Sequence, residues 1–100
     1  MATFFISRHP GAQQWARCQQ LPVNHWVVHL DITQIQPGDT VIGTLPVNLA
    51  AAVCMRGARY LHLSLTLPAE ARGRELSADE LTQYGARLRG FNIQPGEPPL

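Results

Sequence analysis

The chain has 100 residues, which is enough for one domain with a single hydrophobic core. Hydrophobic residues make up 45% of it and charged residues 15%, which excludes a disordered chain, and no apolar window reaches the length of a membrane span. A net charge of +1 excludes a general nucleic-acid coat but leaves a small anionic ligand open. Because the N-terminus also lacks the features of a secretory signal, we expect a cytoplasmic protein with neither DNA nor a membrane as its partner.

The reactive side chains show no signature of a metal or a cofactor. The two cysteines, Cys18 and Cys54, have no CxxC spacing, and the four histidines show no HxH or HExxH arrangement. The sequence also contains neither a GxGxxG dinucleotide fingerprint nor a Walker A loop. We therefore predict no metal site and no cofactor.

The first part of the chain alternates strands with a helix. Hydrophobic periodicity predicts a strand over Thr3–Ser7, a helix from Pro10 to about Gln20, and a second strand over His25–Leu30. In Gln36–Asp39, proline and glycine occupy the two central positions that favour a type II turn. A short third strand is expected over Thr40–Gly43.

A helix and the clearest strand follow. The alanine-rich segment Leu49–Arg56 predicts a helix that Gly57 ends. In Arg59–Leu67, leucines alternate with more polar side chains, so we expect a strand with one core face and one semi-polar face. The semi-polar face consists of Tyr60, His62, Ser64 and Thr66.

The last helix has a strong start signal. Ser77–Glu80 is a capping box of the form S-x-x-E, and Leu76 and Leu81 have the spacing of a hydrophobic staple. Apolar residues at helical spacing predict that the helix continues to Gly90, with Phe91–Ile93 as a possible edge strand. The buried stripe of this helix would be Leu81, Tyr84, Leu88 and Phe91.

The order of these elements predicts a small α/β fold. Parallel strands need right-handed crossovers, so the series β-α-β-β-α-β-α implies a mostly parallel sheet with helices on both faces, which is a minimal Rossmann-like fold. We expect residues 1–93 to form this single domain and residues 94–100, rich in proline and glycine, to form a disordered tail.

A hydroxyl, a guanidinium and an imidazole stand in consecutive positions where the first strand gives way to the first helix. Open α/β sheets bind ligands at such junctions, so Ser7, Arg8 and His9 are candidates for phosphate binding or catalysis. Gly11 would let a ligand approach the backbone. His9 is the best candidate for acid–base work, since imidazoles titrate near neutrality. The alternative is equally favoured: Ser7 or His9 would only cap the N-terminus of the helix.

A second strand-to-helix junction repeats the pattern at Gly43–Asn48. If the first and third strands are neighbours, Thr44 and Asn48 would face the first junction across a crevice flanked by two helix N-termini. Gly43 would line the same crevice. Taken singly, Thr44 and Asn48 are favoured as helix caps, and only the pairing of the two loops favours a site.

Two arginines flank a glycine in the loop before the last helix. Arg72 and Arg74 would form a mobile anion clamp at the same end of the sheet. The alternative is a solvated connector in which these arginines pair with Glu70 and Glu75.

The sequence resembles the Csx-sixteen family, small CRISPR-associated accessory proteins found beside type III systems. The similarity runs from about Phe4 to Phe91. It is carried by four short segments, which are Ser7–Ala12 with Trp15, His29–Leu30, Pro37–Pro46 and Gly57–Leu63. The resemblance implies a dimeric, Rossmann-like ring nuclease that degrades cyclic tetra-adenylate, the second messenger of type III complexes.

The residues are chemically consistent with this implied activity. Each phosphodiester of the ring carries an adjacent ribose 2′-hydroxyl as nucleophile, so no metal is required. We expect Arg8 to neutralise the phosphorane and His9 to act as general base or acid. The residues expected to bind ligand are Ser7, Gly11, Gly43, Thr44, Asn48, Arg72 and Arg74. Two rivals remain, a module that binds the ring without cleaving it and a subunit that docks on a protein through the semi-polar face.

Overall fold

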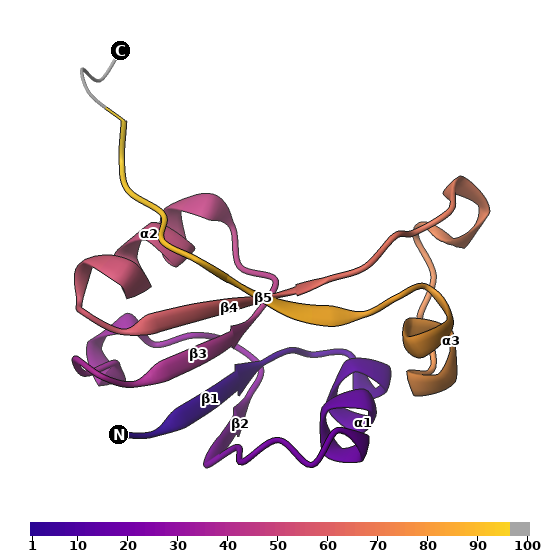
Figure 1. The fold of residues 1–100 in the computed structure, drawn as a ribbon, viewed down its shortest axis with the longest axis horizontal. Coiled ribbons are helices and arrows are strands. Elements are labelled where there is room, and N and C mark those ends of the chain that lie inside the picture. The colour runs from indigo at the N-terminus through magenta and orange to yellow at the C-terminus, as the bar shows by residue number, and fades with distance from the viewer. Residues whose placement is uncertain (97–100) are drawn as a thin grey trace.

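The computed structural model describes residues 1–96 and contains one five-stranded sheet (Figure 1). The strands are β1 (Thr3–Ile6), β2 (His25–Val27), β3 (Thr40–Gly43), β4 (Arg59–Ser64) and β5 (Arg87–Phe91). The α-helices are α1 (Pro10–Cys18), α2 (Val47–Met55) and α3 (Ala78–Gln83), and two 3-10 turns, η1 (Ile32–Gln34) and η2 (Ala69–Ala71), lie in the loops. No helix within residues 1–96 has the length and hydropathy of a membrane span.

The sheet has the order β2-β1-β3-β4-β5. Strands β1 to β4 are parallel, and β5 pairs antiparallel with β4. Because the chain places β2 on one side of β1 and β3 on the other, the order reverses between β1 and β3, where doubly wound sheets open their ligand crevice. The predicted fold class, a mostly parallel Rossmann-like α/β fold, is confirmed.

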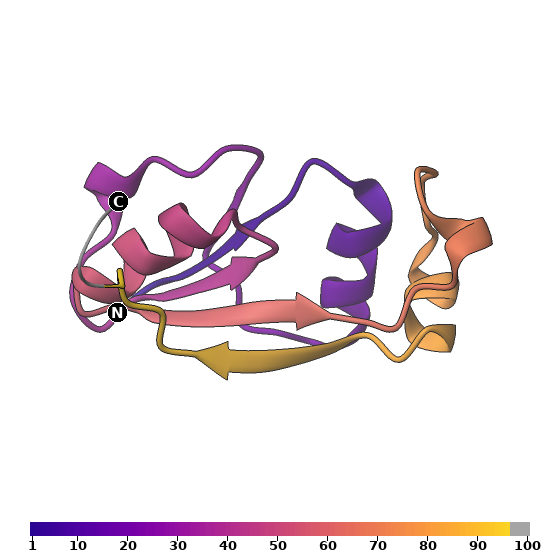
Figure 2. The same cartoon turned by 90° about the horizontal axis from the view of Figure 1, so that it is seen from above.

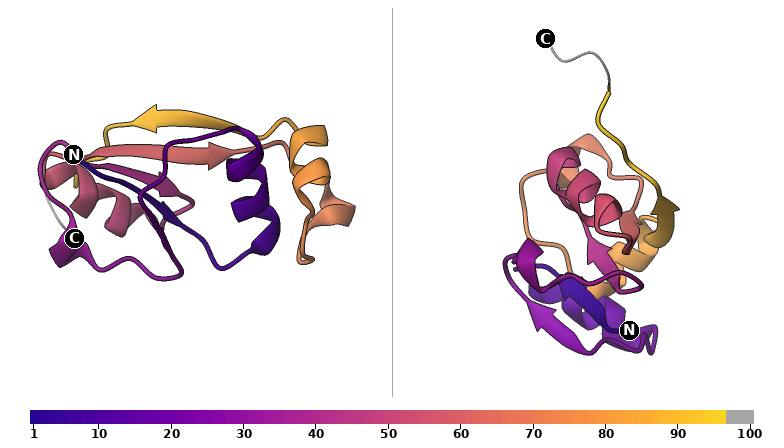
Figure 3. Two further views of the ribbon diagram at one scale, coloured as in Figure 1. Left: turned by 90° about the horizontal axis from the view of Figure 1, so that it is seen from below. Right: turned by 90° about the vertical axis from the view of Figure 1, so that its left-hand side faces the viewer.

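Both faces of the sheet are buried at its central strands β1 and β3, as the apolar strands of a parallel sheet require. On β1, Phe5 points to one face, while Phe4 and Ile6 point to the other. The first face packs against α1 and α3 through the cluster Phe5, Ala12, Trp15, Ala16, Ile42, Leu63 and Leu81. The second packs against α2 through Phe4, Ile6, Ile35, Val41, Ala50, Val53, Ala58 and Tyr60. Figures 2 and 3 show α1 and α3 grouped at the carboxyl-terminal end of β4 and α2 lying alongside the sheet.

The prediction of a long last helix is wrong. Helix α3 ends at Gln83, and Gly85 has a φ of +77°, a left-handed conformation that stops the helix and turns the chain back. Leu88 therefore lies in β5, opposite Leu63 of β4, instead of on a helical stripe. An edge strand is present, but it spans Arg87–Phe91 and coincides with the predicted Phe91–Ile93 only at Phe91.

The semi-polar face expected on β4 is partly buried. Tyr60 is only 2% exposed and belongs to the core cluster beneath α2, so it is not part of a surface open to a partner. The strand pairing itself ends at Ser64, short of the predicted Leu67, and β2 likewise ends at Val27. Alternation predicted the two faces correctly, but amphipathicity alone did not show that a helix covers the more polar one.

Of the predicted tail, residues 94–96 form no helix or strand, and residues 97–100 lie outside the described part of the chain.

The capping box of α3 is confirmed and predicts a stability effect. The Ser77 hydroxyl accepts a hydrogen bond from the Glu80 amide at 3.1 Å, and the Glu80 carboxylate accepts one from the Ser77 amide at 3.1 Å. We expect Ser77→Ala to lower the free energy of unfolding by about 1 kcal/mol, measured by urea denaturation. Gln83→Ala, an exposed change on the same helix, should leave it within about 0.5 kcal/mol; equal effects of both changes would contradict the capping role.

A buried carboxylate stabilises the start of the sheet and predicts a pH effect. Asp39 closes the predicted turn, in which its amide donates to the Gln36 carbonyl and Gly38 has a φ of +88°. Its carboxylate accepts hydrogen bonds from the amides of Ala2 and Gln36, each at 2.9 Å, and these bonds lower its pKa below 3.8. A lowered pKa contributes stability above the unfolded-state value, which is lost as the pH falls through the folded-state value. Asp39→Asn should therefore lower the free energy of unfolding at neutral pH. In acid the difference between the variant and the wild type should largely disappear, as urea titrations at the two pH values would show.

Candidate functional site

The carboxyl-terminal ends of β1 and β3 lie side by side and bring the two predicted junctions together. Ile6 and Gly43, the last residues of the two strands, are register partners. Ser7 and Thr44 follow them directly, so both strand-to-helix loops start at the same point of the sheet edge. The predicted convergence of the two loops at a switch point is confirmed.

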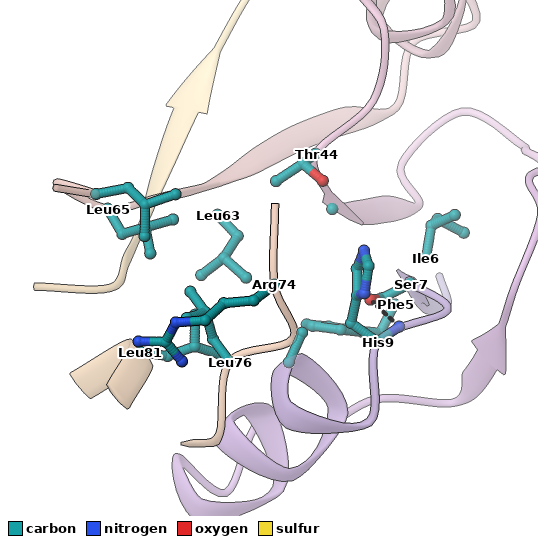
Figure 4. A pocket seen from close by; sticks show the side chains of 13 residues that line it. Phe5, Ile6, Ser7, His9, Thr44, Leu63, Leu65, Arg74, Leu76 and Leu81 are labelled. Carbon is teal, nitrogen blue, oxygen red and sulfur yellow. Dashed lines mark hydrogen bonds between the residues drawn. The ribbon is translucent and has the colours of Figure 1, made fainter. Parts of the chain in front are cut away.

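Two adjoining cavities occupy this edge. One is a leucine-lined pocket of about 170 Å³ and the other an open depression of about 460 Å³. Both are lined by Ile6, Ser7, His9 and Thr44, so these residues form the boundary between the two cavities. Figure 4 shows Thr44 across the pocket from Ser7 and His9.

His9 is oriented by a carboxylate from the far part of the chain. Its Nδ1 lies 2.7 Å from Oε1 of Glu75, and the two side chains are 50% and 65% exposed. An ionised carboxylate only accepts, so Nδ1 carries the proton and Nε2 of the neutral ring keeps its lone pair. The sequence did not indicate that Glu75 contacts His9, because the two residues are 66 positions apart. The result is a base–orienter pair at the mouth of the pocket.

The three candidate arginines have different surroundings. Arg8 lines the open depression and forms no ion pair with any other residue of the 1–96 segment. Arg74 lines the pocket (Figure 4). Its guanidinium lies 2.8 Å from the Glu80 carboxylate, and this contact raises the pKa of the arginine and lowers that of the acid. Arg72 is exposed and lines neither cavity. The alternative that Arg74 pairs with Glu75 is wrong, because Glu75 binds His9.

His9 occupies the N-cap position of α1, as one alternative predicted, but no other candidate cap residue caps either helix. Helix α1 has His9 at its N-cap and α2 has Pro46, and neither helix has a side-chain cap. The Ser7 hydroxyl instead accepts from the His9 amide at 3.0 Å, inside the loop. Thr44 and Asn48 are both exposed, but Thr44 lines both cavities and Asn48 lines neither. Uncapped first turns keep amide N–H groups available to an anion.

The two candidate glycines allow close packing. A Cβ at Gly43 would lie 2.9 Å from the Ile6 carbonyl oxygen, so glycine lets β1 and β3 approach at the floor of the pocket. Gly11 lines neither cavity; a Cβ there would overlap the carbonyl oxygen of Leu76. In the structure Gly11 therefore packs α1 against the segment before α3 and does not face the predicted crevice.

This packing predicts that a substitution that normally stabilises a helix will destabilise this protein. Gly→Ala inside a helix normally stabilises, yet we expect Gly11→Ala to lower the free energy of unfolding by about 1–3 kcal/mol, because backbone must move to admit the methyl group. Gly90→Ala is a matched control, since its Cβ would make an ordinary 3.6 Å contact with Leu61. A stabilised Gly11→Ala protein in thermal denaturation would refute the contact.

A buried tyrosine holds the second junction in place. The Tyr60 hydroxyl accepts from the Leu45 amide at 3.0 Å and lies 3.2 Å from the Gly43 carbonyl and 2.7 Å from Nδ1 of His62. Burial raises its pKa, so the phenol stays protonated at neutral pH. The sequence pattern placed Tyr60 on a semi-polar face, and nothing local in it signalled this clamp around Thr44.

Among residues 1–96, no three His, Cys, Asp or Glu side chains are grouped closely enough to hold a metal ion. The site is therefore built from one imidazole–carboxylate pair, one unpaired guanidinium, two hydroxyls and two uncapped helix N-termini.

Comparison with known proteins adds a family to this geometry. No curated protein and no solved structure matches the chain. One family model matches residues 4–94, which include both junctions, the pocket and all of the sheet except Thr3. The chain therefore belongs to the CRISPR-associated family whose description reads "Putative CRISPR-associated protein (Cas_VVA1548)".

Proposed function

We propose that this protein is a ring nuclease that cleaves cyclic tetra-adenylate and so switches off type III CRISPR signalling. The observation that carries the proposal is the convergence of Ser7, Arg8, His9 and Thr44 around adjoining cavities at the β1/β3 switch point. Membership of a CRISPR-associated family supplies the biological context in which such a ligand occurs.

The proposed reaction uses the nucleophile that the substrate carries. A ribose 2′-oxygen attacks the adjacent phosphorus, the bond from phosphorus to the 5′-oxygen breaks, and a 2′,3′-cyclic phosphate forms. The leaving 5′-oxygen keeps the electron pair of that bond and takes a proton from solvent. Nε2 of His9, left free because Nδ1 faces Glu75, takes the proton of the 2′-hydroxyl. Arg8 stabilises the phosphorane charge, since its guanidinium has no competing carboxylate among the described residues.

The remaining polar groups bind and orient. In this proposal the Ser7 and Thr44 hydroxyls and the amides at the two helix N-termini contact riboses or phosphates along the ring; their position around the cavities supports this. A homodimer is part of the proposal, because a twofold ring matches a twofold assembly in which each contact is made twice. Two cuts of the ring would then give two linear di-adenylates.

Incubation of the protein with labelled cyclic tetra-adenylate tests the proposal. We expect linear di-adenylates with 2′,3′-cyclic phosphate ends, formed at the same rate with and without EDTA. Ring that stays intact at stoichiometric protein would end the nuclease proposal.

A module that binds the ring without cleaving it is the main rival. Both proposals predict stabilisation of roughly 2.7 kcal/mol when the ring is present at ~100 times its dissociation constant. Intact ring together with such a shift would favour binding alone, and absence of both would favour a protein-docking subunit.

A further inference from the structure

The leucine-lined pocket has an apolar wall that the proposed chemistry does not explain. Its volume is about 170 Å³, and it lies between the end of β4 and the helices α1 and α3. Its apolar walls are formed by Phe5, Leu63, Leu65, Leu67, Leu76 and Leu81 (Figure 4). Phosphate binding needs donors and positive charge, which leucine side chains cannot supply.

Apart from Arg74, the polar side chains of this pocket lie at one boundary. Ser7, His9 and Thr44 stand where it meets the open depression, and the only cation in the wall, Arg74, is paired with Glu80. A ligand that enters here would therefore place an uncharged part inside and a polar or charged part at the Ser7–Thr44 boundary.

Two of the leucines leave the sheet to form this wall. Strand β4 ends at Ser64, yet Leu65 and Leu67 continue along the pocket and are only partly buried. Apolar side chains gain about 25 cal/mol for each Å² removed from water, so a hollow lined by partly exposed leucines stabilises an apolar guest. The pocket is smaller than the roughly 300–1,000 Å³ typical of sites for drug-sized ligands, so it accommodates a fragment and not a whole nucleotide.

We propose that this pocket takes one purine base of the ring, with the attached ribose at Ser7 and Thr44 and the next phosphate in the open depression beside Arg8. This subsite rests on the proposed function and adds to it the part of the substrate that the leucine wall recognises. A base is planar and largely apolar on its faces, and it is attached to a polar sugar, which matches an apolar interior next to a polar boundary.

The test compares two ligands that differ only in the base, adenosine 5′-monophosphate and ribose 5-phosphate. Methyl NMR of the unmodified protein reads binding at individual leucines and valines. We expect the nucleotide to bind at least about tenfold more tightly and to shift the methyl signals of Leu65 and Leu67. Equal affinity, no binding of either ligand, or shifts confined to Val28 and Leu49 of the open depression would overturn the subsite.

A pocket-filling variant gives a second readout. Leu67→Trp should raise the KM for the ring at least about tenfold with a smaller change in kcat, whereas Met55→Trp, on the exposed surface of α2, should change neither. Thermal denaturation confirms that both variants fold, and should Leu67→Trp not fold, the ligand comparison alone decides. Ring cleavage without base preference would refute only the subsite, and base preference without cleavage would refute only the nuclease.

Discussion

Replacing Arg8 by alanine should reduce the rate of ring cleavage by roughly 10²- to 10³-fold while the protein remains folded. Arg8 lines the open depression beside His9, and its guanidinium has no ion-pair partner among residues 1–96, so its charge is available to a phosphate. A group that stabilises the phosphorane more than the ground state affects kcat more than KM. Single-turnover cleavage of labelled cyclic tetra-adenylate measures this split directly.

The control for this experiment is another exposed arginine. Arg59 lies at the amino-terminal start of β4, away from the two junctions, and Arg59→Ala should cleave the ring at the wild-type rate. Arg8→Lys keeps the charge but loses the planar fork, so we expect it to recover only part of the activity. Wild-type turnover by Arg8→Ala would show that another residue supplies the catalytic charge.

The site was predictable from the sequence where local chemistry determined it. Ser7 and Thr44 could be paired because short apolar runs precede both, and parallel strands expose their carboxyl ends at one edge of a sheet. The capping box at Ser77 and the turn at Gln36–Asp39 were predicted correctly for the same reason, since each rests on residues three positions apart.

Features that depend on distant contacts could not be predicted. The Glu75 partner of His9 and the Tyr60 clamp around Thr44 join segments 66 and 15–17 residues apart, and no periodicity encodes them. Gly11 was interpreted as a site of ligand approach, although the Leu76 backbone occupies that space. A glycine allows close approach of any backbone, and the sequence does not say whether a ligand or the chain itself makes it.

The strand β5 shows a competition between local signals. Leu81, Tyr84 and Leu88 have helical spacing, but Gly85 is three residues before Leu88 and adopts a left-handed conformation. Pairing with β4 then takes up the backbone groups of Arg87–Phe91, which a helix would otherwise have satisfied within itself. Long-range pairing outweighed a short apolar stripe here.

Replacing His9 by alanine should lower kcat by roughly 10²- to 10⁴-fold and remove the limb of the pH–rate profile that the imidazole contributes. The structure separates this effect from folding, because His9 is the N-cap of α1 without any side-chain cap bond and is half exposed. Helix α1 should therefore survive the change, as circular dichroism and thermal denaturation would show.

Glu75→Gln gives the decisive comparison. The amide keeps a hydrogen-bond acceptor for Nδ1, so the ring keeps its orientation and the rate of ring cleavage should fall less than in Glu75→Ala, which removes the acceptor altogether. Equal rates for the two variants would show that Glu75 does not orient His9. If instead His9→Ala kept both its rate and its pH profile, proton transfer would have to come from another group or from the solvent, and the imidazole–carboxylate pair would be a surface ion pair that takes no part in the reaction.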